Sequence, residues 1–213
     1  MIHRFNPPPK RAEQKFCKNL ILIEGYDDAE VIENYASQEL GVDPGILSLF
    51  EFNGTQDNYQ NLQAAFKRLL YTHSETPFTQ IGIILDSEGK DKETIERNIK
   101  KLLSGHGLPT NILKILVLEP ALEKILMESV SANRLYQCVN KFITCAESHG
   151  AWESKANSRM WKLKAEVSAY TSISRHKKHD HSIGHTSRKS QNIWNFQSNA
   201  FSELKVFLSH FKD

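Results

Sequence analysis

Short apolar runs alternate along the chain with segments in which apolar residues recur every three to four positions. The runs lie at residues 19–23, 46–52, 81–85 and 112–118 and consist largely of Ile, Leu, Val and Phe. Continuous apolar runs bounded by turn residues predict strands that are buried on both faces. Between the runs, residues 27–36, 59–71 and 93–103 have the apolar spacing of helices, and a further helix is expected over residues 121–128, after Pro120. This alternation predicts a parallel sheet covered by helices.

The pattern changes near residue 134. Helical spacing recurs at residues 135–148, 162–172 and 203–211 with no apolar run between them. The predicted fold class is therefore α/β, a four-stranded and mainly parallel sheet flanked by helices, with a helical C-terminal extension. We predict an extended lead-in over residues 1–18, an α/β domain over residues 19–133, and a helical extension over residues 134–213 that packs on the sheet through its aromatic residues. The proline run Pro7-Pro8-Pro9 favours an exposed lead-in.

Composition is that of an ordinary globular protein. The chain has 213 residues, of which 39% are hydrophobic and 24% charged, which excludes a disordered or fibrous protein. Its formal net charge of +2 neither requires nor excludes nucleic acid, although Lys and Arg gather between Lys155 and Lys189. Three cysteines, odd in number, predict reduced thiols. The lack of a signal-peptide core predicts a cytoplasmic location. No apolar stretch reaches about 18–20 residues, so we expect no membrane span.

Acidic residues follow three of the predicted strands. Glu24 comes directly after the first, Asp86 and Glu88 after the third, and Glu119 after the fourth. Parallel strands joined by right-handed crossovers end at one edge of a sheet, which is where open α/β sheets bind ligands. Gathered carboxylates repel one another unless a cation balances them, and Mg²⁺ prefers oxygen ligands. The pattern predicts a Mg²⁺ or Mn²⁺ site, although a single acid after a strand is more often a turn former or helix cap.

The residues around these acids resemble a known domain. Leu22-Ile23-Glu24-Gly25 followed by Asp27-Asp28, together with Ile83-Ile84-Leu85-Asp86-Ser87-Glu88, resembles the TOPRIM domain of topoisomerases, primases and overcoming-lysogenization-defect nucleases. This resemblance covers about residues 19–130. More narrowly, the chain is similar to small TOPRIM proteins of the overcoming-lysogenization-defect nuclease type with a helical tail, through Lys162-Leu163-Lys164-Ala165, Ser182-Ile183-Gly184 and Trp194-Asn195-Phe196.

The resemblance implies a role for each matching residue. Glu24 matches the glutamate that acts as general acid or base, and Asp86 matches the first aspartate of the metal-binding Asp-x-Asp motif. Glu88 stands in place of the second aspartate, which keeps the charge but lengthens the side chain. Asp28 matches an acidic position of the nuclease branch.

Two further positions follow from the same resemblance. Either Glu119 or Glu123 supplies an additional acid of the nuclease branch as a metal ligand, and the sequence leaves this choice open. Lys164 lies where the related proteins have a lysine, which can stabilise the negative charge that develops during phosphodiester cleavage. An ordinary exposed helix lysine is the alternative interpretation.

A basic, histidine-rich segment lies between the last two predicted helices. Its predicted nucleic-acid contacts are Arg175, Lys177, Lys178, Arg188 and Lys189. Its histidines, His176, His179, His181 and His185, raise the alternative of zinc. With no cysteine nearby and lysines between the histidines, a solvated basic loop is favoured over zinc, and a surface without a partner is as good an interpretation as a nucleic-acid contact.

The resulting hypothesis is a metal-dependent TOPRIM nuclease that cleaves DNA or RNA. The chain is too short for the additional domains of a topoisomerase or primase. The resemblance further implies a role in defence against phage beside an ATPase partner protein. The alternative is a non-catalytic interaction subunit of a nucleic-acid-processing or defence complex, for which Glu88 is the best support. The choice between DNA and RNA and the presence of a homo-oligomer stay open.

Overall fold

The computed structural model describes residues 3–5, 17–43, 45–52, 58–72, 78–105, 110–153, 155, 158–174, 182–189 and 192–212. Its strands are β1 (His3–Phe5), β2 (Asn19–Ile23), β3 (Leu47–Glu51), β4 (Gln80–Asp86) and β5 (Leu113–Leu118). Its α-helices are α1 (Tyr26–Glu39), α2 (Asn58–Thr72), α3 (Lys92–Ser104), α4 (Leu122–Ser129), α5 (Arg134–Ser148), α6 (Ser158–Ile173), α7 (Ile183–Thr186) and α8 (Ser202–Ser209). Short 3₁₀ turns, η1 (Thr110–Ile112) and η2 (Asn199–Phe201), precede β5 and α8.

The described strands form one parallel sheet in the order β1-β3-β2-β4-β5. The predicted α/β class with four parallel strands is confirmed, and β2 and β4 lie side by side in its middle. The short strand β1 was not predicted, since the lead-in was expected to be irregular. Three residues pair with β3 at the sheet edge, which is too short a segment for apolar periodicity to reveal.

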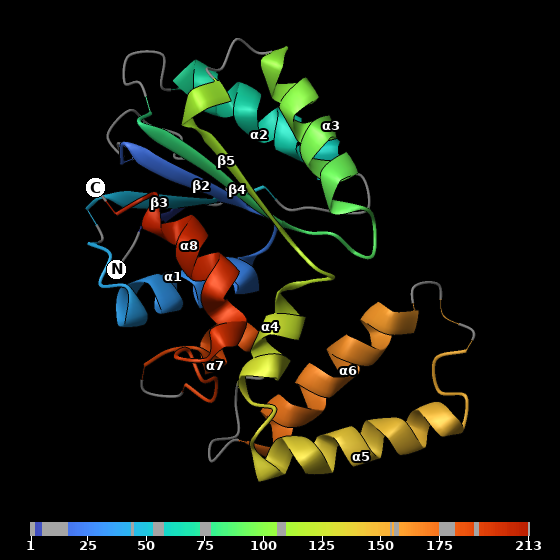
Figure 1. The fold of residues 1–213 in the computed structure, drawn as a ribbon. Coiled ribbons are helices and arrows are strands. Elements are labelled where there is room, and N and C mark those ends of the chain that lie inside the picture. Colours follow the sequence, from blue (N-terminus) through green and yellow to red (C-terminus); the bar gives the residue numbers. More distant parts are fainter. Residues whose placement is uncertain are drawn as a thin grey trace.

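Alternate residues of each strand face opposite sides of the sheet, as the pleat requires. Leu20 and Leu22 of β2 pack with residues of α2 and α3, whereas Ile21 and Ile23 pack with residues of α1, α4, α6 and α8. Figure 1 shows α2 and α3 above the sheet and α1 and α8 below it. The strands are therefore buried on both faces, which explains why their sequences are continuously apolar.

The C-terminal part of the chain completes one face of the sheet. Its aromatic residues, predicted as core, are buried: Trp194, Phe196, Phe201, Phe207 and Phe211. Phe201 stacks on Tyr35 of α1 with ring centroids 4.8 Å apart, and Phe196 meets the same ring edge to face at 5.3 Å. Through these ring contacts, the tail packs against α1 in the hydrophobic core.

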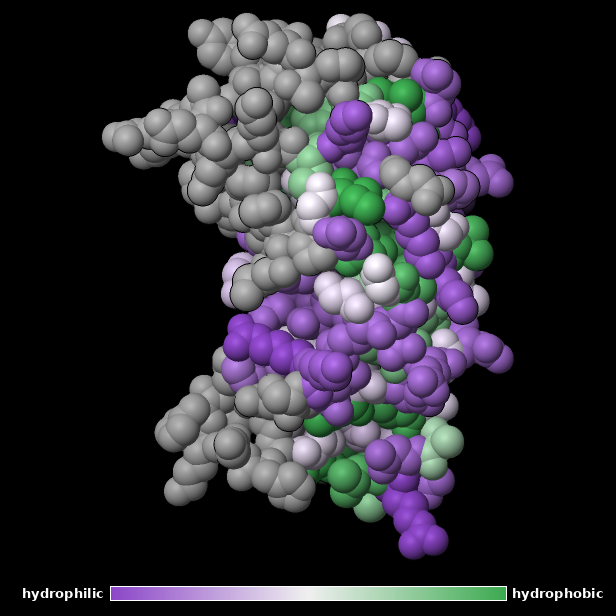
Figure 2. Space-filling model, turned by 90° about the vertical axis from the view of Figure 1, so that its left-hand side faces the viewer, coloured by the Kyte–Doolittle hydropathy of each residue, from purple (hydrophilic) through white to green (hydrophobic). Residues whose placement is uncertain are grey.

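Helices α5 and α6 pack against each other as a hairpin below the sheet (Figure 1). Leu163, Val167 and Tyr170 of α6 join the hydrophobic core. On the face shown in Figure 2, hydrophilic side chains cover most of the described surface, and hydrophobic ones are visible in smaller areas between them. None of the helices in the described part of the chain is long and apolar enough to cross a membrane.

The tail approaches the sheet most closely at Gly82 of β4. A Cβ atom at this position would lie 2.7 Å from Phe211 Cζ and 2.9 Å from Phe207 Cζ, which is closer than atoms can pack. We therefore expect Gly82→Ala to lower the free energy of unfolding by about 1–3 kcal/mol through overpacking, measured by urea denaturation. Gly105→Ala is the control, because a Cβ there meets its nearest neighbour at 3.5 Å. Equal stability of the two variants would contradict this packing.

Candidate functional site

Two acidic residues lie where the central strands end. Glu24 follows β2 directly and Asp86 is the last residue of β4, and the pairing of Ile23 with Ile84 places both strand ends at the same edge of the sheet. Glu24 is half-buried, and its Oε2 atom is shielded from solvent. The prediction that these two acids come together at one edge agrees with this placement.

Two helices bring further acids to the same edge. Asp28 lies in the first turn of α1, which begins immediately after Glu24-Gly25. Glu123 lies in the first turn of α4, and the backbone N–H of Leu122 donates a hydrogen bond of 3.1 Å to Asp86 Oδ1. This bond ties the end of β4 to the start of α4. We call Glu24, Asp28, Asp86 and Glu123 the acid cluster.

The charges of the acid cluster act strongly on one another. The pKa of Asp28 is raised from 3.8 to about 8, chiefly by desolvation and further by the charges of Glu123 and Glu24. Desolvation likewise raises the pKa of Asp86 well above its usual value, with contributions from Asp28, Glu123 and Glu24. Burial and the neighbouring negative charges therefore both favour the protonated form of these two carboxyl groups.

Lys164 of α6 is the cation whose charge acts on this cluster. It lowers the pKa of Asp28, against the effect of the surrounding acids. Asp27, the neighbour of Asp28, adds to the negative charge. Asp27 was not predicted as a site residue, although its position in the Asp27-Asp28 pair was the available signal.

The remaining predicted acids lie differently. Glu119 is exposed, whereas Glu123 is half-buried and belongs to the acid cluster, so the structure distinguishes between these two candidates. Glu88 has a left-handed backbone with φ of 50°, and its N–H donates to the carbonyl oxygen of Pro120 at 2.9 Å. The charges that raise the pKa of both Asp28 and Asp86 include Glu123 and Glu24.

The predicted basic contacts are only partly described. Arg175, Lys177 and Lys178 lie outside the described residues, as do His176, His179 and His181. Arg188 forms an ion pair with Glu30 of α1, whose side chain is only 3% exposed. Arg188 therefore fastens the tail to α1, whereas Lys189 is exposed.

The donor set of the acid cluster fits a hard divalent cation in kind, because all of its ligand atoms are carboxylate oxygens. The arrangement is open: in the parts of the chain that the structure describes, no three His, Cys, Asp or Glu side chains are grouped closely enough to hold a metal ion.

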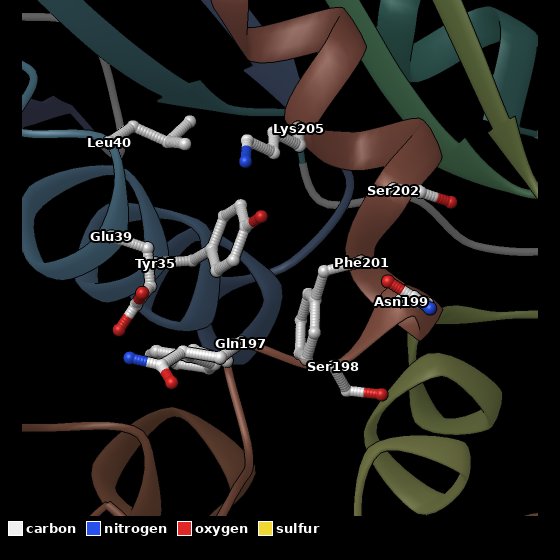
Figure 3. A pocket seen from close by; sticks show the side chains of 10 residues that line it. Tyr35, Glu39, Leu40, Gln197, Ser198, Asn199, Phe201, Ser202 and Lys205 are labelled. Carbon is white, nitrogen blue, oxygen red and sulfur yellow. The ribbon is translucent and has the colours of Figure 1, made fainter.

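A separate pocket of about 320 Å³ lies between the second half of α1 and the segment leading into α8. Figure 3 shows Tyr35, Glu39, Phe201 and Lys205 around it. None of the predicted site residues lines this pocket, so it is distinct from the acid cluster.

Comparison with known proteins places the chain in a family. Residues 18–213 match the model of a family described as "Protein of unknown function (DUF3226)". The chain belongs to this family. The DUF3226 match spans both the sheet and the helical tail, and no curated protein matches the chain. Among solved structures, the chain is similar to the C-terminal region of the Burkholderia pseudomallei OLD protein, with 15% identity, a TM-score of 0.45, and coverage of 90% of this chain and 98% of that chain.

The raised pKa of Asp28 predicts how the stability of the metal-free protein depends on pH. Between about pH 4 and pH 8 the folded state keeps a proton that the unfolded state releases, so stability falls as pH rises through this range. Asp28→Asn removes the ionisable group, and we expect it to raise the melting temperature in EDTA at pH 8 more than at pH 5. Glu119→Gln, at an exposed acid, is the matched control. The same change for both variants at both pH values would contradict the electrostatic coupling.

Proposed function

We propose that this DUF3226 protein is a nuclease that depends on a divalent metal and cleaves phosphodiester bonds in DNA or RNA at the acid cluster. One observation carries the proposal: carboxylates from the end of β2, from β4 and from the first turns of α1 and α4 meet at one edge of the sheet, where burial and the neighbouring charges raise the pKa of Asp28 and Asp86 and Lys164 of α6 acts on Asp28. The TOPRIM resemblance of the segments around Glu24 and Asp86 supports the same assignment.

The acid cluster would hold Mg²⁺ or Mn²⁺ through Asp86, Asp28 and Glu123. Such an ion supplies Lewis-acid polarisation of the phosphate when it is bound. Glu24 would transfer a proton at the attacking or leaving oxygen, as general acids and bases do in phosphodiester cleavage. Lys164 would stabilise the negative charge that develops on the phosphate oxygens.

A second candidate is a non-catalytic interaction subunit that retains the sheet. The open spacing of the acids and the left-handed backbone of Glu88 favour it. Defence against phage and an ATPase partner, which the TOPRIM resemblance implies, remain proposals for either candidate.

Cleavage assays distinguish the two candidates. We expect cleavage of single-stranded or plasmid DNA, or of RNA, in Mn²⁺ and none in EDTA. Glu24→Ala and Asp86→Ala should each lower the rate at least about 100-fold, as expected for loss of an acid–base group or a metal ligand. Glu119→Ala is the matched acidic control and should stay within about threefold of wild type, within the range of a surface substitution. Equal cleavage by all variants would refute the enzyme, and absence of both cleavage and Mn²⁺ binding in wild type would favour the interaction subunit.

The placement of Glu88 and Glu123 predicts that they differ in importance. Because the charge of Glu123 raises the pKa of both Asp28 and Asp86, Glu123→Gln should weaken Mn²⁺ binding about 10- to 100-fold, the range seen when a group supporting a metal site is removed. Glu88→Gln, at a half-buried position with a left-handed backbone, should change Mn²⁺ affinity less than about threefold, the range for a substitution that removes no ligand. Isothermal titration calorimetry with Mn²⁺ measures both affinities. A larger loss of Mn²⁺ affinity for Glu88→Gln than for Glu123→Gln would contradict this ranking. It would indicate instead that Asp86 and Glu88, the residues that match the Asp-x-Asp motif, bind the metal.

A further inference from the structure

A large aromatic side chain is exposed on the helix that carries Lys164. Trp161 of α6 is 51% exposed. A single exposed aromatic residue is common on protein surfaces, so its position has to decide its meaning. Trp161 precedes Lys164 by three residues, and residues three apart share one face of a helix, here about 4.5 Å apart along its axis.

This face of α6 lies beside the acid cluster. Lys164 acts electrostatically on Asp28, and α6 packs against α4, whose first turn carries Glu123. Figure 1 shows α6 next to α4, beyond the end of the sheet where β5 leads into α4. A ligand that reaches the acid cluster along α6 would therefore pass the Trp161 ring.

Lysine side chains lie near the Trp161 ring. The ammonium of Lys155 lies over Trp161, with Nζ 5.2 Å from the ring centroid. Lys164 is also exposed, on the face of α6 that it shares with Trp161. An aromatic ring among cations matches the chemistry of a sugar-phosphate chain with an unpaired base, because the base stacks on the ring while the cations attract phosphates.

We propose that Trp161 is a stacking platform for an unpaired base and that the site takes single-stranded nucleic acid. A base inside a duplex already stacks on its neighbours and is not available to the ring. That the bound strand is a substrate rests on the proposed nuclease function. Binding of the strand to Trp161 does not require cleavage.

Fluorescence anisotropy in EDTA tests the binding without turnover. The probes are a labelled 12-nucleotide oligo(dT), the matching oligo(U), a DNA duplex of mixed sequence and an abasic oligonucleotide of the same length. We expect both single strands to bind more tightly than the duplex, and Trp161→Ala to weaken their binding about 5- to 150-fold, the range for loss of one stacked base. Trp161→Phe should retain most of the affinity. Phe142→Ala on α5, which removes a 64% exposed aromatic residue, is the matched control and should bind as wild type.

Each arm has a defined consequence. The abasic strand should bind weakly and equally to wild type and Trp161→Ala, since it offers phosphates but no base. Wild-type affinity of Trp161→Ala for oligo(dT) and oligo(U), or a preference for duplex over both, would overturn the proposal. Cleavage that persists with unchanged binding in Trp161→Ala would leave the nuclease intact and refute the platform. Binding that depends on Trp161 in a protein that never cleaves would support the platform and refute the nuclease.

Discussion

Repulsion among carboxylates at one edge of the sheet is the constraint on which the arrangement of this protein depends. The acid cluster is formed at the ends of two strands and the starts of two helices, and burial together with the charges of its members raises the pKa of Asp28 and Asp86. Left to themselves, these groups would separate or keep their protons. They stay together because the backbone holds them, through the pairing of β2 with β4 and the hydrogen bond from Leu122 to Asp86.

The helical tail contributes to this restraint by fixing α1. Arg188 pairs with the buried Glu30, and Ser187 accepts hydrogen bonds from Asn34 and Gln38. Gly184 of α7 approaches α1 so closely that a Cβ atom would lie 2.7 Å from Glu30 Oε2. These contacts oppose a movement of α1 that would carry Asp28 away from the cluster. The family match over residues 18–213 is consistent with sheet and tail forming one structural unit.

Much of the fold could be predicted because its strands are buried on both faces. Such strands are continuously apolar, so their positions and the acids that follow them are visible in the sequence. The choice between Glu119 and Glu123 was not predictable, because it depends on where α4 starts after β5: Glu123 lies in the first turn of the helix, whereas Glu119 precedes it and is exposed. The role of Arg188 was also missed, since its partner Glu30 lies 158 residues away along the chain and local pattern carries no signal of it.

We infer that a divalent cation balances the negative charge of the acid cluster. Its binding should therefore release protons from the carboxyl groups of the cluster. A pKa of about 8 leaves Asp28 largely protonated at pH 7 without metal, and the pKa of Asp86 is raised as well, whereas ligation requires the carboxylate form. Titrating Mn²⁺ calorimetrically in buffers of different ionisation enthalpy counts the protons released. We expect a net release of protons from wild type, and a smaller release from Asp28→Asn. Absence of Mn²⁺ binding, or binding with no proton release, would contradict this inference.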